Sequence, residues 1–365
     1  MSAESLRPAA SRARVEKPQG RLARMIALAH SVGAAATLNH IAAAVAVRRR
    51  PTRVASWPRF LQFEVSSRCN MACAQCSRST LGPPQHQGHM SLSTFEKLLA
   101  HFRHFQHVTL HGLGEPLLNH DLAAMARAVK ARAPMATIGL NTNGVLLTPA
   151  RVAELVEAGL GEIGVSLDAA TASTHQVVRG GRFDQIVHQV GAVCELSARP
   201  SVALALVVME PNVGELVEFV ELGAQLKVDR ISFCDLSARW KPEGTDPMAV
   251  ESIERARRMT LAAERRAAEL NLPFVYTKLD RALWPEAFIP CFYLWDYPYV
   301  TWEGFLTPCC ALPYAETAAL GDLRSSSFKS IWNGPGYRAM RDGLSRGRIP
   351  ELCRGCHHAA PGVVR

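Results

Sequence analysis

Short apolar runs that alternate with amphipathic helical stretches constrain this chain more than any other feature. Six runs rich in apolar and β-branched residues cover Phe60–Ser67, Val108–Gly112, Ala136–Asn141, Glu162–Leu167, Val202–Val208 and Arg230–Leu236. Stretches with apolar positions three or four residues apart separate them, over Leu92–His104, Leu122–Arg132, Pro149–Ala158, Phe183–Leu196 and Val213–Leu226. This alternation predicts a parallel α/β sheet, either open and doubly wound or curled into a barrel.

Residues capable of chemistry follow the first four runs. Three cysteines come after the first run, Gly114-Glu115-Pro116 after the second, Thr142-Asn143-Gly144 after the third and Asp168 after the fourth. Parallel α/β proteins bind ligands at the carboxyl ends of their strands. We therefore expect a binding site at this edge of the sheet.

The cysteines after the first run carry the strongest chemical signal. The segment reads Cys69-Asn-Met-Ala-Cys73-Ala-Gln-Cys76, three thiols within eight residues, and we call it the three-cysteine loop. Three thiolates can hold three irons of a 4Fe-4S cube and leave the fourth iron open to another ligand. A structural zinc ion would need a fourth ligand, and none is adjacent. Catalysis by a thiol gives no reason for three, so an iron-sulfur cluster is the favoured interpretation.

The C-x3-C-x2-C spacing after a first strand resembles that of the radical S-adenosylmethionine (radical SAM) superfamily. Five spaced elements between about Phe60 and Leu236 agree with that family. The resemblance implies a partial (β/α)6 barrel, SAM as cofactor and a 4Fe-4S cluster held by Cys69, Cys73 and Cys76. It implies that SAM is bound by residues at the strand ends and beyond them, namely Gly114, Glu115, Asn143, Ser166 and Arg179. Among these, Glu115 would accept from the SAM amino group and Arg179 would pair with its carboxylate. Gln75 departs from the family, in which this position is usually aromatic and packs near adenine.

A second set of cysteines lies near the end of the chain, at Cys291, Cys309, Cys353 and Cys356. With the paired Cys309-Cys310, the Gly321-Asp322 turn and Ile331-Trp332-Asn333, it resembles the SPASM/twitch extension of radical SAM enzymes. Nine residues follow Cys356 and none is cysteine, so the resemblance implies one auxiliary 4Fe-4S cluster with four protein ligands. Four cysteines also suit a zinc ribbon, and Cys353-Arg-Gly-Cys356-His357 has the form of a haem-attachment string.

The remaining cysteines include Cys234, which ends the sixth run. A thiol there could face a substrate inside the barrel, although packing in the core is the simpler interpretation. We therefore treat Cys234 as a candidate catalytic residue. As a hydrogen-atom donor, it would make the enzyme a redox-neutral epimerase.

The N-terminal region carries the whole excess of positive charge. Residues 1–60 hold eleven Lys/Arg and two Glu, and this excess of nine positive charges equals the formal net charge of the whole chain, +9. The rest of the chain is neutral overall, which argues against a basic nucleic-acid-binding domain, and we expect no nucleic-acid partner. Met25–Val47 has no charged residue, but it is mostly alanine with interspersed polar groups, which disfavours a membrane span, and a secretory signal fits poorly. We expect a cytoplasmic protein whose Ala-rich helix packs on the main domain. A sharper alternative is peripheral contact of residues 21–53 with anionic lipid or an acidic partner.

Four segments are predicted. They are a basic extension with an Ala-rich helix over 1–56, a radical SAM core barrel over 57–240, a helical linker over 241–290 and a SPASM/twitch-like auxiliary cluster domain over 291–365. The resemblance implies a radical SAM oxidoreductase that abstracts hydrogen from a small-molecule alcohol or amino sugar, with the auxiliary cluster accepting an electron. The alternative is a maturase of a ribosomally made peptide, acting by crosslinking, thioether formation or epimerisation. A flavodoxin- or ferredoxin-type protein would donate electrons.

Overall fold

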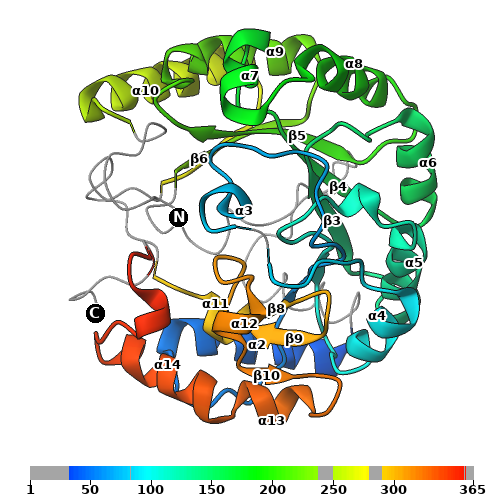
Figure 1. The fold of residues 1–365 in the computed structure, drawn as a ribbon. Helices are drawn as coiled ribbons and strands as arrows, with labels where there is room; N and C mark the ends of the chain where they lie inside the picture. The colour runs from blue at the N-terminus through cyan, green and yellow to red at the C-terminus, as the bar shows by residue number, and fades with distance from the viewer. Residues whose placement is uncertain (1–32, 83, 237–249, 279–289, 357, 359–365) are drawn as a thin grey trace.

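The computed structural model describes residues 33–82, 84–236, 250–278, 290–356 and 358. Its centre is one ten-stranded sheet with the order β10-β9-β8-β1-β2-β3-β4-β5-β6-β7. The pairs from β1 to β7, and that of β1 with β8, are parallel, whereas β9 and β10 run antiparallel to their neighbours. The sheet curves like a horseshoe with helices around its outside (Figure 1). The predicted partial α/β barrel is therefore confirmed.

The strands are short and lie where the apolar runs predict them. Those of the barrel are β1 (Phe60–Phe63), β2 (His107–Thr109), β3 (Thr137–Thr142), β4 (Glu162–Ser166), β5 (Ser201–Val208), β6 (Arg230–Asp235) and β7 (Phe274–Thr277). Strand β7 is an addition to the six predicted strands, and it lies in the segment expected to be a helical linker. That segment also contains the expected charged helix, α10 (Ile253–Glu269). The outer helices between β1 and β6 are α4 (Leu92–Leu99), α5 (Leu122–Arg132), α6 (Pro149–Glu157), α7 (Ala172–Arg179), α8 (Phe183–Cys194) and α9 (Leu216–Gln225).

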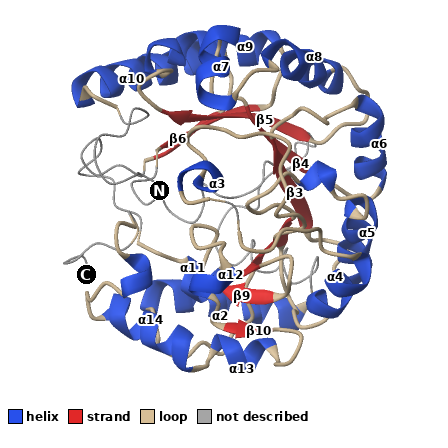
Figure 2. Cartoon of the chain, viewed as in Figure 1, coloured by secondary structure: helices blue, strands red, loops and turns tan. Residues whose placement is uncertain are grey.

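Side chains alternate between the two faces of the barrel strands. On β6, Phe233 points outward and packs against Phe219 of α9, with ring centroids 5.7 Å apart. Its neighbour Ser232 faces the inside, where it lines a cavity. This period of two puts apolar groups under the helices and leaves the inner face free to carry polar groups. In Figure 2, the helices from α4 to α10 lie outside the curve of the sheet.

The C-terminal segment continues the same sheet. Strand β8 (Tyr299–Val300) pairs with β1 through Gln62↔Tyr299, and β9 (Phe305–Thr307) and β10 (Gly321–Asp322) follow it. Around them lie α11 (Tyr293–Asp296), α12 (Ala315–Ala318), α13 (Phe328–Trp332) and α14 (Pro335–Ser345). The fully buried Arg341 of α14 joins these parts, because it donates to the carbonyls of Leu294 and Trp332, each at 2.7 Å.

Helix α2 (Ala34–Arg49) is the part of the predicted Ala-rich helix that lies among the described residues. It packs on the barrel through Asn39, whose side chain accepts from the backbone N–H of Trp57 at 2.7 Å and donates to the Trp57 carbonyl. His40 lies within hydrogen-bonding distance of the His104 carbonyl, at 2.8 Å. No helix in the described part of the chain is long and apolar enough to cross a membrane.

Candidate functional site

The three-cysteine loop leaves β1 and leads into the short helix α3 (Ser77–Thr80), inside the curve of the sheet (Figure 1). The Cys76 amide donates to the Cys73 carbonyl at 3.1 Å, which forms the turn between the last two cysteines. The Ala74 amide donates to the Val178 carbonyl of α7, so this helix holds the loop in place. Burial raises the pKa of Cys73 to about 11, and the positive charge of Arg179 opposes this shift. The fold therefore holds the three-cysteine loop against α7, with Arg179 beside Cys73.

Glycine is required where the segment after β2 crosses the start of this loop. A Cβ on Gly114 would lie 2.3 Å from the Arg68 carbonyl oxygen, much closer than side-chain contacts allow. Next to it, Glu115 is buried, and its carboxylate accepts from the Thr142 hydroxyl at 2.7 Å and from the Asn143 amide at 2.8 Å. Burial raises the pKa of Glu115, and these hydrogen bonds oppose that shift. Glu115 and Asn143, both predicted from the sequence, thus lie together.

Asn143 also connects this group to the three-cysteine loop. Its side-chain amide donates to Asn70 at 2.7 Å and lies 3.8 Å from the Cys69 sulfur. Asn70 was not predicted, since an asparagine inside a cysteine loop gives no signal of its own. Ser166 lies at the end of β4, paired with Ala205 of β5, where the sequence placed it.

Asp168 organises the opposite side of the loop. One carboxylate oxygen accepts from the Val207 amide at 2.7 Å, and the other accepts from the Gln75 side chain at 2.8 Å and from Arg179. Asp168 and Arg179 form a buried ion pair. Burial opposes the charge of Arg179, but Asp168 and Cys73 favour it, so the pKa of Arg179 is raised. From the sequence, Asp168 was predicted only to follow the end of a strand. In the structure, its ion pair with Arg179 holds that side chain beside Cys73.

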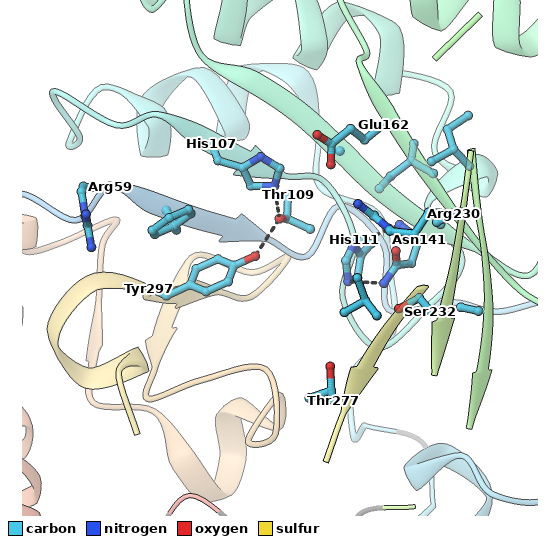
Figure 3. A pocket seen from close by; sticks show the side chains of 18 of the residues that line it. Arg59, His107, Thr109, His111, Asn141, Glu162, Arg230, Ser232, Thr277 and Tyr297 are labelled. Atoms are coloured by element: carbon cyan, nitrogen blue, oxygen red, sulfur yellow. Dashed lines mark hydrogen bonds between the residues drawn. The ribbon is translucent and has the colours of Figure 1, made fainter. Parts of the chain in front are cut away.

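A cavity of about 270 Å³ lies inside the barrel (Figure 3). It is near the small end of protein ligand sites, which span roughly 300–1,000 Å³. Asn141 of β3 and Ser232 of β6 line it. Asn143 follows Asn141 by two residues, just beyond the end of β3, and Cys234 follows Ser232 by two residues on β6. At about 3.3 Å per residue, these lining residues lie about 7 Å below the level of Asn143 and Cys234. The cavity is therefore continuous in position with the candidate site and not a separate feature.

The cavity wall is polar and carries both charges. Glu162 of β4 and Arg230 of β6 both line it. Burial raises the pKa of Glu162, and the positive charge of Arg230 partly offsets this shift. No hydrogen bond or ion pair is formed by either side chain with another described residue. The two charges are therefore available to a ligand.

A hydrogen-bonded chain closes one side of the cavity. The ring of His107 lies 3.0 Å from the Thr109 hydroxyl, which lies 2.7 Å from the hydroxyl of Tyr297 (Figure 3). Burial lowers the pKa of His107 to about 4, so the imidazole is neutral near pH 7. None of these residues was predicted, because they come from β2 and from the distant segment after α11.

Cys234 is half-buried at the end of β6, in register with Val207 of β5 and Thr277 of β7. Burial, with Asp168 and Asp235 nearby, raises its pKa to about 12. The group is therefore a protonated thiol near neutral pH. This state is compatible with a hydrogen-atom donor and equally with simple packing.

The C-terminal cysteines also come together. Burial raises the pKa of Cys309, and the charges of Cys310, Cys291 and Cys356 add to the shift, which places these sulfurs near one another. The Cys356 amide donates to the Cys353 carbonyl at 3.1 Å. Cys310, which the sequence did not count as a ligand, lies 3.7 Å from the Tyr293 hydroxyl. In the described part of the chain, no three His, Cys, Asp or Glu side chains converge as ligands of a single metal ion do.

Comparison with known proteins matches these two regions separately. Residues 63–223 match the radical SAM superfamily, and residues 291–357 match the SPASM iron-sulfur cluster-binding domain. The chain is a radical SAM enzyme with a SPASM domain. This radical SAM enzyme therefore uses SAM and two 4Fe-4S clusters.

Relatives of this radical SAM enzyme extend over most of its length. It is 28% identical to a PqqA peptide cyclase of Rhizobium meliloti (strain 1021), over 82% of this chain and 79% of that protein. It is 24% identical to a tungsten-containing aldehyde ferredoxin oxidoreductase cofactor-modifying protein of Pyrococcus furiosus, over 82% of this chain and 87% of that protein. Its fold is similar to that of SuiB from Streptococcus suis bound to the precursor peptide SuiA, with a TM-score of 0.67 at 16% identity, over 88% of this chain and 74% of SuiB.

The polar groups around the three-cysteine loop fit SAM. Among the described residues, Arg179 Nε and Gln75 Oε1 are buried without a hydrogen-bond partner, although both side chains are fixed by Asp168. Burying polar atoms without partners costs free energy, so both atoms favour a ligand that satisfies them. SAM carries a carboxylate that can accept from Arg179 and amino groups that can donate to Gln75. The residues present are therefore suited to this cofactor.

Proposed function

We propose that this radical SAM enzyme modifies a ribosomally made peptide, by crosslinking, thioether formation or epimerisation. The observation that carries the proposal is the 28% identity to a PqqA peptide cyclase. This similarity extends over 316 residues, and it is therefore much longer than residues 63–223, which match the radical SAM superfamily. The mycofactocin maturase MftC of Mycobacterium tuberculosis is 30% identical over 48% of this chain and 45% of that protein. The peptide cyclase favours a peptide over the small-molecule alcohol or amino sugar that the sequence put first, and the second relative is a maturase, as in the alternative.

In this proposal the two cysteine sets hold the two clusters. The three-cysteine loop holds the cluster that binds SAM, and the auxiliary cluster is held by Cys291, Cys309, Cys353 and Cys356. SAM is held by residues on both sides of the loop, namely Gly114, Glu115, Asn143, Ser166 and Arg179. When bound and reduced, this pair of cofactors supplies a 5′-deoxyadenosyl radical that removes hydrogen from an unactivated carbon. The segment boundaries at residues 56, 240 and 290 belong to the same proposal.

The cavity below the SAM site would take one side chain of the peptide. Its volume of about 270 Å³ suits a single side chain and not a folded segment. Glu162 and Arg230 would orient that side chain through its polar end, because both charged side chains line the cavity, from the strands on either side of β5. Holding the reacting carbon in one place directs hydrogen removal to that carbon, and exclusion of water prevents side reactions. A flavodoxin- or ferredoxin-type protein would supply the electron.

The test uses anaerobically reconstituted enzyme, SAM, a strong reductant and the short peptides encoded beside the gene, followed by mass spectrometry. We expect one peptide to change in mass at a defined residue. Arg230→Gln should abolish this change while still permitting 5′-deoxyadenosine to form, since the cavity lies below the SAM contacts. Arg266→Gln, a matched substitution on the outside at α10, should behave as wild type. If no such peptide is altered and an alcohol or amino sugar is oxidised instead, the peptide proposal is wrong.

A second candidate is small-molecule dehydrogenation, with the auxiliary cluster accepting the second electron. The small cavity with its two charged side chains favours it, because its size suits a small polar molecule. In either case Cys234 separates oxidation from epimerisation. Turnover in deuterated water by an epimerase should place one solvent deuteron on carbon and should stop in Cys234→Ala. An oxidation should instead survive Cys234→Ala and stop in Cys309→Ala.

A further inference from the structure

Helix α2 shows an inverted distribution of side chains. Its polar residues Thr37, Asn39 and His40 are buried against the protein. Leu38 and Val45, in contrast, are 67% and 45% exposed. An ordinary surface helix presents the opposite pattern, with its apolar side towards the core. The exposed side of α2 is therefore unexplained by the packing of the described residues.

The exposed apolar residues form one row. Leu38, Ile41 and Val45 are three and four residues apart, so they lie on one side of the helix, and we call them the α2 row. The inward position of the polar groups is fixed, because Asn39 makes two hydrogen bonds with Trp57 and the ring of His40 lies within hydrogen-bonding distance of His104 and Gln106. The helix consequently cannot rotate to bury its apolar row without losing these contacts.

Positive charge adjoins the C-terminal end of the α2 row. Arg48 and Arg49 end the helix and Arg53 follows closely, and all three are exposed. Arg50 faces the other way, since it donates to the Cys291 carbonyl and lies over the Trp295 ring. The helix contains no Asp or Glu. Its outer side thus combines an apolar row with positive charge, and within the described part of the chain Arg48, Arg49 and Arg53 form no ion pair.

We propose that the α2 row and the three exposed arginines bind the surface of a lipid bilayer that contains anionic headgroups. A helix lying in the interface inserts its apolar side chains between headgroups, and arginines at its border pair with lipid phosphates. Residues 1–32 are a poor alternative occupant, because they carry six Lys/Arg and two Glu and would be repelled by the arginines. The proposal does not depend on the peptide substrate.

The position of α2 suits this contact. The helix lies beside α11 at the lower side of the molecule (Figure 1), and Val47 of α2 lines the floor of the barrel cavity. The three-cysteine loop follows the carboxyl end of β1 and lies at the opposite end of the barrel strands. Binding of the bilayer through α2 would therefore leave that end of the barrel accessible to its substrate.

The experiment is sedimentation of the full chain with vesicles of phosphatidylcholine, or of phosphatidylcholine mixed with phosphatidylglycerol. We expect binding to the mixed vesicles that weakens as salt is added. Replacing Arg48, Arg49 and Arg53 by Ala should lower the partition coefficient about a hundredfold, since each basic residue contributes about fivefold. Leu38→Asp/Val45→Asp should lower it at least about tenfold. Both positions are exposed, so the far-UV circular dichroism should be unchanged.

Helix α10 provides the matched control. Replacing Arg257, Arg258 and Arg265 by Ala removes the same charge from an outer helix that also carries glutamates, and it should leave vesicle binding nearly unchanged. Three outcomes would overturn the proposal. These are equal binding to both vesicle types, an equal loss in the α10 variant, and α2 variants that alter the oligomeric state by light scattering without altering vesicle binding.

Discussion

The buried ion pair of Asp168 and Arg179 gives the sharpest test of the site geometry. We consider Asp168→Asn, which preserves the shape of the side chain and removes its charge. The carboxylate is 2% exposed and accepts from Val207, Gln75 and Arg179. The replacing amide offers one acceptor oxygen, so its NH2 group would face the donors of Gln75 or Arg179. Arg179 would then be left as a buried charge without its counterion.

Removing one partner of a buried ion pair costs about 3–5 kcal/mol. We therefore expect Asp168→Asn to lower the free energy of unfolding by that amount. Arg179→Met should also destabilise, but the double variant should cost less than the sum of the two, because it leaves no unpaired charge. Glu195→Gln provides the control, since it removes the solvent-exposed ion pair with Lys227 and should give no measurable change.

The assay is anaerobic urea unfolding of reconstituted protein, followed by circular dichroism. SAM affinity is measured on the same samples, and it should fall in Asp168→Asn because Arg179 loses the group that orients it. If Asp168→Asn unfolds at the same urea concentration as Glu195→Gln, the pair is not the buried organising contact described above. Strictly additive effects of the two single substitutions would contradict the reasoning as well.

Three further predictions concern neighbouring features. Gly114→Ala should destabilise by about 1–3 kcal/mol and abolish SAM binding in calorimetry, because its Cβ would lie 2.3 Å from the Arg68 carbonyl oxygen, whereas Gly161→Ala, whose nearest contact is Ile138 at 3.7 Å, should bind normally. Burial raises the pKa of Glu64 from 4.5 to about 7, so between these pH values the folded protein keeps a proton that the unfolded chain has lost. The free energy of unfolding should therefore fall by about 3 kcal/mol as the pH rises through this range. Urea titrations at about pH 5 and 8 should show this fall for the wild type and not for Glu64→Gln. Iron analysis should give about eight irons per chain, and about four when all three cysteines of the three-cysteine loop are alanine; unchanged iron, or zinc in the second site, would contradict the cluster assignment.

Local patterns in the sequence were sufficient to predict most of the barrel. Leu122–Arg132 is a helix with the predicted bounds, and β4 to β6 begin within one residue of the predicted positions. Each of these elements buries one side against its neighbours, so its apolar residues recur every two residues in a strand or about every 3.6 residues in a helix. The elements are long enough for this period to be recognised in the sequence. The three-cysteine loop was predictable for a different reason, since the spacing of its ligands is itself a local property.

The additional strands β7 and β8 could not be predicted from local patterns in the sequence. Strand β7 has four residues and β8 has two, too few for periodicity to distinguish them from loops. Their conformation is fixed by pairing, with β7 against β6 and β8 against β1. For β8 the partner is more than two hundred residues away in the sequence, and no local pattern encodes that contact.

The sequence by itself determined the chemistry, and the tertiary structure decided where that chemistry meets a substrate. Cysteine spacing specifies an iron-sulfur cluster because its ligands are close along the chain. The cavity charges Glu162 and Arg230 lie on β4 and β6, and they line one cavity only because both strands pair with β5 in the sheet. In the same way, the sequence of α2 predicts an alanine-rich helix but does not indicate which side is buried, because its polar and apolar residues are intermixed along the chain. Only packing decides which side is buried, and here Asn39 and His40 turn inward because their partners lie on distant segments of the barrel.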